Sequence, residues 1–218
     1  EGKRIAISGS GNVALYAAEK AIQKKAKVIS LSDSDGFVEF ADGLSEEQWE
    51  FVRELKEERR GRISEMADKF DGVKFHKDEN PWGLDCDVAM PCATQNELDE
   101  EAAKTLVSND VLAICEGANM PTTAGAAEVF KKEKVLHAPG KASNAGGVAV
   151  SGLEQSQNAM RISWSRDEVD ERLRSIMCDI HARCVENGEN EKDFSYVDGA
   201  NLAGFKKVAE AMLSYGVA

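Results

Sequence analysis

The residues best suited to chemistry lie near the start of the chain, where an apolar run ends in a glycine-rich turn. Residues 4–8 are followed by Gly9-x-Gly11-x-x-Ala14 and then by apolar residues at helical spacing. In such a turn the first glycine permits a sharp bend, the second lets backbone approach a phosphate, and the small third residue lets the helix pack on the strand. Free N–H groups at the helix start then face an anion. The turn therefore predicts dinucleotide binding.

The next apolar run favours this prediction over an ordinary strand–turn–helix corner. Residues 27–32 read as a second strand, and Asp33 follows it. Asp33 comes about 20 residues after Gly11, which is the offset of the acid that meets the adenine ribose in dinucleotide-binding folds. Because a 2′-phosphate would meet a negative charge there, the acid by itself favours NAD.

Other residues near Asp33 favour NADP. Ser32 and Ser34 flank it and can donate hydrogen bonds to a phosphate. Basic side chains on a following helix and turn suit a dianionic phosphate: Lys56, Arg59 and Arg62. The alternative is that these bases balance neighbouring surface acids. We predict NADP as the coenzyme, with NAD as the second choice.

Three further loops follow predicted strands and are rich in small and polar residues: 91–97, 116–123 and 138–148. Their amide and hydroxyl groups suit the sugar hydroxyls and the carboxamide of a nicotinamide nucleotide. The alternative for each loop is turn chemistry and helix capping. A nucleophilic serine is not predicted, because no histidine with an orienting acid can be argued beside one. No metal site is predicted either, because His181 and Cys184 supply only two ligands.

Alternating strand and helix patterns must position these loops. Strands are expected at 4–8, 27–32, 73–76, 86–90, 111–115 and 134–137, and helices at 12–24, 45–57, 60–70, 97–107, 122–132 and 142–158. Only helical patterns follow residue 150, and the last of them, about 195–214, has a face expected to be buried: Leu202, Phe205, Val208, Ala209, Met212 and Leu213. This order predicts an α/β fold, a doubly wound, Rossmann-like and mainly parallel sheet with C-terminal helices. We expect a dinucleotide-binding domain over 1–150 and a helical segment packing on it over 151–218.

Composition narrows the class of protein. The chain has 218 residues and a formal net charge of −12, which argues against nucleic acid and anionic membranes as partners. No apolar run approaches the ~20 residues of a membrane-spanning helix. The five cysteines form no Cys-x-x-Cys pair and are expected to be reduced thiols of a cytoplasmic protein.

Taken together, the motifs resemble the coenzyme domain of glutamate dehydrogenase. The resemblance covers essentially the whole chain and is greatest to hexameric, NADP-using enzymes of bacteria, fungi and protists. It rests on the turn at 8–14, on the three loops at 91–97, 116–123 and 138–148, and on two later segments at 152–158 and 196–205.

The resemblance implies a reaction, in which L-glutamate is oxidatively deaminated to 2-oxoglutarate and ammonia, and roles for individual residues. The coenzyme would contact Ser8 and, through its pyrophosphate, Gly9, Ser10, Gly11, Asn12 and Val13. Its cleft would be lined by Ala93, Thr94 and Gln95, and its nicotinamide side would meet Gly117 and Asn119. The substrate would face Asn144, Val148 and Ser151, with Ser151 a candidate for the distal carboxylate.

The family's catalytic lysines and aspartate belong to an amino-terminal substrate domain, which is not found in this sequence. That domain also makes most contacts of the homo-hexamer. We therefore expect no catalytic residue in the chain, and coenzyme binding without turnover. Two alternatives remain: the coenzyme domain of a leucine, phenylalanine or valine dehydrogenase, or a non-catalytic NAD(P)-binding module.

Overall fold

The computed structural model describes residues 1–189 and 194–216. The chain divides into two compact units, Glu1–His137 and Ala138–Ala218. The division falls after His137 rather than after residue 150, because α6 (Gly140–Ser143) and α7 (Ala145–Met160) both pack on α8 (Arg166–Gly188). The expected segment 151–218 includes 190–193 and 217–218, which lie outside the described residues.

Within the described residues, the first unit is built on a seven-stranded sheet in the order β4-β3-β2-β1-β5-β6-β7. Its strands are β1 (Arg4–Ile7), β2 (Lys27–Asp33), β3 (Gly36–Phe40), β4 (Val73–Lys77), β5 (Val88–Met90), β6 (Ala113–Cys115) and β7 (Leu136–Ala138). β1 pairs in parallel with β2 and β5, and β5 with β6. The strand order reverses at β1, so the turn after β1 lies at the switch point where doubly wound folds bind ligands. The α/β, mainly parallel prediction is confirmed.

One strand was missing from the sequence prediction. β3 pairs antiparallel with both β2 and β4, so this edge of the sheet is a meander. Gly36 begins β3 at φ 144°, and a side chain there would collide with the His76 carbonyl oxygen. The hairpin follows Asp33 directly, and the polar residues 34 and 35 form its tight turn.

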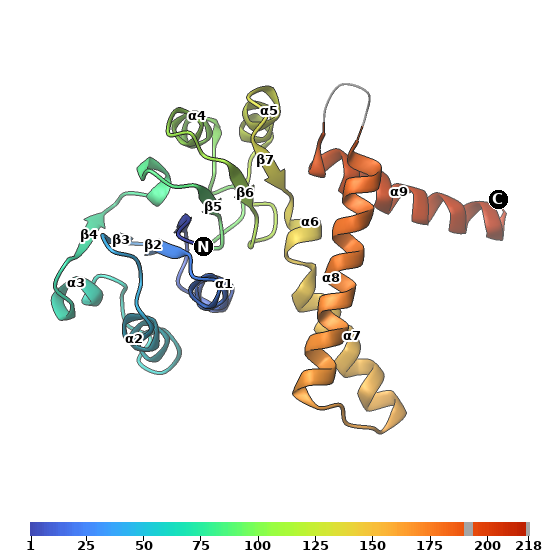
Figure 1. Ribbon diagram of the computed structural model, residues 1–218, viewed down its shortest axis with the longest axis horizontal. Coiled ribbons are helices and arrows are strands. Elements are labelled where there is room, and N and C mark those ends of the chain that lie inside the picture. The colour runs from blue at the N-terminus through green and yellow to red at the C-terminus, as the bar shows by residue number, and fades with distance from the viewer. Residues whose placement is uncertain (190–193, 217–218) are drawn as a thin grey trace. The chain divides into compact units, whose positions relative to one another are not determined.

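Helices cover both faces of this sheet (Figure 1). On one face α1 (Asn12–Gln23), α2 (Glu46–Glu57) and α3 (Glu65–Lys69) bury a core that includes Leu15, Val52 and Met66. On the other, η1 (Pro81–Gly83), α4 (Glu100–Ser108) and α5 (Ala124–Lys132) bury Trp82, Leu106 and Phe130. The helix expected over 60–70 is confined to α3, because residues 59–63 form a loop held by the polar contacts described below.

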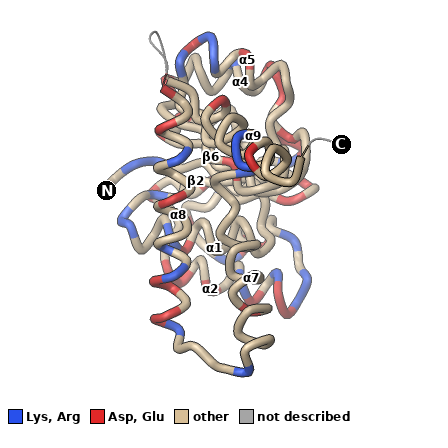
Figure 2. Tube along the Cα trace, turned by 90° about the vertical axis from the view of Figure 1, so that its right-hand side faces the viewer, with Lys and Arg blue, Asp and Glu red and all other residues tan. Residues whose placement is uncertain are grey.

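The second unit is helical. α8 packs against both α7 and α9 (Tyr196–Tyr215). Acidic and basic residues alternate along α8, whereas α7 carries a single charged residue, Glu154 (Figure 2). The prediction that one face of α9 is buried is wrong, since Phe205 is 68% exposed and Leu213 is 73% exposed. α9 instead meets α8 at Gly199, where a side chain would collide with the Cys184 carbonyl oxygen. In the described part of the chain, no helix combines the length and apolarity needed to cross a membrane.

Candidate functional site

Gly9 makes the bend between β1 and α1. Its φ is 84°, and a Cβ there would lie 3.0 Å from the Cys92 carbonyl oxygen. The Gly9 N–H donates to Ser32 Oγ (2.7 Å), and the Ser32 N–H donates to the Gly9 carbonyl (3.0 Å). Because left-handed backbone and close packing both exclude a side chain, Gly9 is required by the fold itself.

At Gly11, in contrast to Gly9, the backbone itself does not require glycine. Its backbone is extended (φ −86°), and a Cβ there would meet nothing within 4 Å. It is the N-cap of α1 and has no side chain with which to cap the helix, and the first turn of α1 contains no acidic residue. Residues 11–13 at the helix start line a cleft, which is an arrangement that can accommodate a phosphate at the helix N-terminus.

A cleft of about 740 Å³ adjoins this turn. It is lined by residues 8–13 from the turn, 32–34 from the end of β2, 79–82 from the β4–η1 segment, and 92–94 and Glu97 after β5. The structure thus gathers most of the predicted coenzyme contacts around one cavity. Six predicted residues are not part of the lining: Lys56, Arg59, Arg62, Gln95, Gly117 and Asn119.

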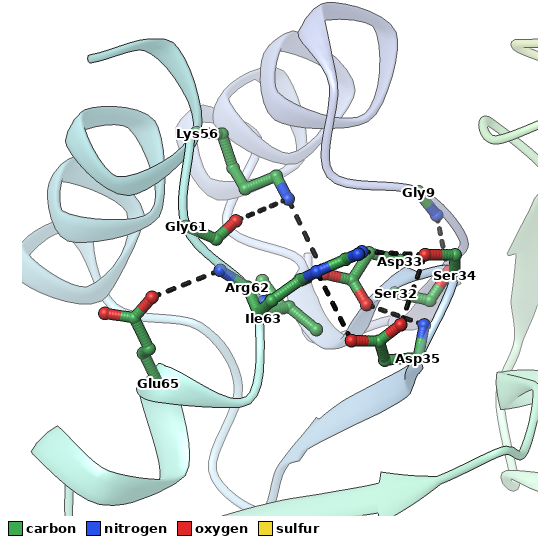
Figure 3. Close-up of polar contacts among 10 residues, drawn as sticks. All are labelled: Gly9, Ser32, Asp33, Ser34, Asp35, Lys56, Gly61, Arg62, Ile63 and Glu65. Carbon is green, nitrogen blue, oxygen red and sulfur yellow. Dashed lines mark hydrogen bonds and ion pairs between the residues drawn. The ribbon is translucent and has the colours of Figure 1, made fainter. Parts of the chain in front are cut away.

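The Asp33 carboxylate is occupied by contacts within the protein. Its Oδ1 accepts the N–H of Asp35 (3.0 Å), and its Oδ2 accepts the N–H of Ile63 (2.9 Å) and lies 3.5 Å from Lys56 Nζ (Figure 3). Lys56 also donates to the Gly61 carbonyl (2.9 Å). The Asp33 side chain is only 8% exposed. The carboxylate is therefore neutralised locally and fastens the 61–63 loop to the end of β2.

Two of the three arginines at residues 59–63, Arg62 and Arg59, make different contacts. Arg62 Nη1 donates to Ser34 Oγ (2.7 Å), and its Nε lies 3.3 Å from an Asp35 carboxylate oxygen (Figure 3). Arg59 pairs instead with Glu65 (2.6 Å). Ser34 lines the cleft, so Arg62 is the arginine that borders it.

Glu97 was not singled out by the sequence prediction, although it lies in the loop after β5. Its Oε1 accepts the N–H groups of Ala93 (2.9 Å) and Thr94 (3.2 Å). Burial raises the pKa of this carboxyl, while hydrogen bonds from Ser8, Ala93 and Thr94 oppose the rise. The sequence feature that could have indicated this role is the spacing of Glu97, which follows Thr94 by three residues and Ala93 by four.

The loop after β6 runs beside the loop after β5. Asn96 N–H donates to the Met120 carbonyl (3.0 Å), and Leu98 N–H donates to that of Pro121 (2.9 Å). A Cβ on Gly117 would lie 2.5 Å from Cys92 Sγ, so that glycine lets the two loops approach each other. The neighbouring side chains Gln95 and Asn119 are exposed.

A second contact that the sequence did not predict joins two strand ends. His137 Nε2 and Glu116 Oε1 are 2.8 Å apart, and both side chains are less than a tenth exposed. This pair links the end of β6 to β7.

The predicted substrate residues lie in the second unit. Asn144 is the N-cap of α7, and Val148 and Ser151 follow on it at helical spacing. Residues four and three apart share one helix face, and Val148 is 73% exposed.

The cysteines near the cleft are expected to resist alkylation. Burial raises the pKa of Cys92 to about 12 and that of Cys86 to about 11, whereas Cys178 is exposed. Since the thiolate is the reactive form, iodoacetamide at pH 8 should modify Cys178 at least about tenfold faster than Cys92. Peptide mass spectrometry over time measures both rates, with the urea-unfolded chain as control. Equal rates in the native chain would contradict the buried position of Cys92.

Within the described ranges, no group of three or more His, Cys, Asp or Glu side chains is arranged to hold a metal ion. The site is thus a polar, glycine-edged cleft at the switch point of a doubly wound sheet.

Comparison with known proteins agrees with this geometry. The sequence profile for glutamate/leucine/phenylalanine/valine dehydrogenases matches residues 1–216. The chain belongs to this dehydrogenase family.

Individual members of the dehydrogenase family are similar over the whole chain. The chain is 54% identical over 218 residues to the NAD(P)-specific glutamate dehydrogenase of Xylanibacter ruminicola, covering 100% of this chain and 49% of the relative. It is 53% identical to the NADP-specific enzyme of Escherichia coli, covering 100% and 48%. The solved glutamate dehydrogenase of Plasmodium falciparum superposes with a TM-score of 0.95 at 44% identity, covering 99% and 47%. The chain therefore spans about half the length of these relatives.

Overall identity within the dehydrogenase family does not separate the two coenzymes. The glutamate dehydrogenase of Bacteroides fragilis, named NAD-specific, is 50% identical to this chain, close to the value for the NADP-specific enzyme above. Coenzyme preference has to be argued from the residues around Asp33.

Proposed function

We propose that this chain is the coenzyme-binding part of a glutamate dehydrogenase, and that its cleft holds NADP. The observation that carries the proposal is the Gly9–Gly11 turn, where Gly11 opens the cleft to a phosphate beside an uncapped helix start. When bound, the nicotinamide would exchange a hydride with glutamate or 2-oxoglutarate. The chain's own contribution is to bind and orient: α1 faces the pyrophosphate, and Ala93 and Thr94 form a wall of the cleft.

The preference for NADP rests on the surroundings of Asp33. Its oxygens accept the N–H groups of Asp35 and Ile63, and Oδ2 forms an ion pair with Lys56 Nζ at 3.5 Å, so an incoming 2′-phosphate would not face an uncompensated charge. The exposed Arg62 guanidinium beside Ser34 supplies charge-assisted donors at the cleft edge. Lys56 and Arg59, predicted as direct contacts, stay predictions, and their main role in this arrangement is to hold the loop.

The substrate and the assembly belong to the proposal as well. The similarity to glutamate dehydrogenases supports L-glutamate and 2-oxoglutarate as substrates, with Asn144, Val148 and Ser151 on the substrate-facing side of α7. We further infer that the chain functions in a homo-hexamer, together with a catalytic amino-terminal domain. Five cysteines without a disulfide support a cytoplasmic location.

Calorimetric titration of the 218-residue chain tests the coenzyme proposal. We expect NADP⁺ to bind at least about tenfold more tightly than NAD⁺, because a 2′-phosphate adds charge-assisted hydrogen bonds of about 1.5–3 kcal/mol. Tighter binding of NAD⁺ would contradict the coenzyme preference, and no binding of either would contradict the proposed site. The substrate is tested on the full-length protein that contains this chain, where NADP⁺ reduction with leucine but not glutamate would favour a leucine-type dehydrogenase.

A further inference from the structure

Glu97 is a cleft-lining carboxylate that the proposed function leaves without a role. Its Oε1 accepts two backbone N–H groups, from Ala93 (2.9 Å) and Thr94 (3.2 Å). Both residues line the cleft, and their loop packs directly against the glycine turn, since a Cβ on Gly9 would lie 3.1 Å from Ala93 Cα. A single oxygen thereby holds two consecutive backbone N–H groups of a loop that lines the cleft.

The same carboxylate is connected to the turn itself. Ser8 lies beside the Glu97 carboxylate and opposes the rise in its pKa, and Ser8 Oγ accepts the N–H of Cys92 (2.9 Å). Ser8 is 1% exposed and directly precedes Gly9, whose Cβ position is closed by the Cys92 carbonyl. A continuous hydrogen-bonded network therefore joins the end of β1 to the loop after β5.

The geometry requires an acceptor at Glu97 more than it requires a charge. A half-buried anion beside a cleft for anionic ligands is unfavourable, and partial burial already raises the pKa of Glu97. A neutral amide oxygen at the same position would accept the same two N–H groups. Loss of the acceptor would instead leave the Ala93 and Thr94 amides without that partner, and the loop free to shift.

We propose that Glu97 is a positioning residue for the coenzyme: it holds the 92–94 backbone in place beside Ser8 and Gly9 and so sets the shape of the cleft next to the glycine turn. This inference rests on the proposed function. It predicts that coenzyme affinity follows the side-chain acceptor at position 97 and not its charge.

The test is titration of the 218-residue chain and its variants with NADP⁺, together with hydrogen exchange at the Ala93 and Thr94 amides in the coenzyme-free protein. Glu97→Ala should weaken binding about tenfold and accelerate exchange at both amides, because two hydrogen bonds are lost. Glu97→Gln should stay within about twofold of wild type in affinity and retain slow exchange. Glu100→Ala, which removes an exposed carboxylate on α4, is the matched control.

The outcomes separate the inference from the function it rests on. Unchanged affinity in Glu97→Ala, or an equal loss in Glu97→Gln, would overturn the positioning role. No binding of NADP⁺ to the wild-type chain would overturn the proposed function. The exchange measurement would still show whether Glu97 holds the Ala93 and Thr94 amides. If Glu97→Ala does not fold, Glu97→Asp replaces it. Its carboxylate is one methylene shorter, so it should lose affinity while keeping the charge.

Discussion

Replacing Gly11 with valine should weaken NADP⁺ binding at least about 100-fold, equivalent to about 2.7 kcal/mol, while leaving the chain folded. The reason is that the space beside Gly11 is open in the protein and is the space a pyrophosphate would occupy. The backbone at Gly11 is extended, so valine introduces no left-handed strain. A branched N-cap costs about 1 kcal/mol, and the Tm should fall by no more than about 4 °C.

Gly9→Ala is the matched comparison. Its Cβ would lie 3.0 Å from the Cys92 carbonyl at a left-handed φ, which should cost about 1–3 kcal/mol of stability before coenzyme is added. Differential scanning fluorimetry and calorimetric titration of both variants separate the two effects. Normal NADP⁺ affinity in Gly11→Val would show that the phosphate does not lie on this turn.

Replacing Arg62 with alanine should weaken NADP⁺ binding about 30-fold and leave NAD⁺ binding within about twofold. A charge-assisted hydrogen bond to a phosphate contributes about 2 kcal/mol, and NAD⁺ has no group to receive it. Arg62 borders the cleft through Ser34 Oγ at 2.7 Å. The effect should shrink with rising salt, because the Arg62 side chain is 56% exposed.

The comparison that decides this prediction is Arg59→Ala. Arg59 pairs with Glu65 at 2.6 Å, so its loss should change NADP⁺ affinity less than the loss of Arg62. Titration of both variants with both coenzymes at two salt concentrations measures the difference. An equal loss of affinity for NADP⁺ and NAD⁺ in Arg62→Ala would mean that the arginine supports the loop and does not bind the 2′-phosphate.

Much of the fold was accessible from local patterns, since strand and helix periods and capping residues depend on neighbours in the sequence. The Ser45 capping box, for instance, starts α2 where its pattern indicates. β3 was missed because its identity depends on pairing with β2 and β4 rather than on its own five residues. The exposed apolar face of α9 was misjudged because periodicity shows which residues share a face and not whether anything covers it.

The same division holds for the site. By itself, the sequence determined a glycine-rich turn between a strand and a helix at Gly9–Gly11 and a dehydrogenase family, because glycine spacing and loop motifs are local properties. Only the tertiary structure decided what the charged residues do. The Asp33 carboxylate forms an ion pair with Lys56 and accepts the Ile63 N–H. Arg62 donates to Ser34, whereas Arg59 pairs with Glu65. Glu97 accepts the Ala93 and Thr94 N–H groups. A charge acquires its role from the partners within a few ångströms of it, and in the contacts around Asp33 and Ser34 the fold brings those partners together from positions far apart in the chain.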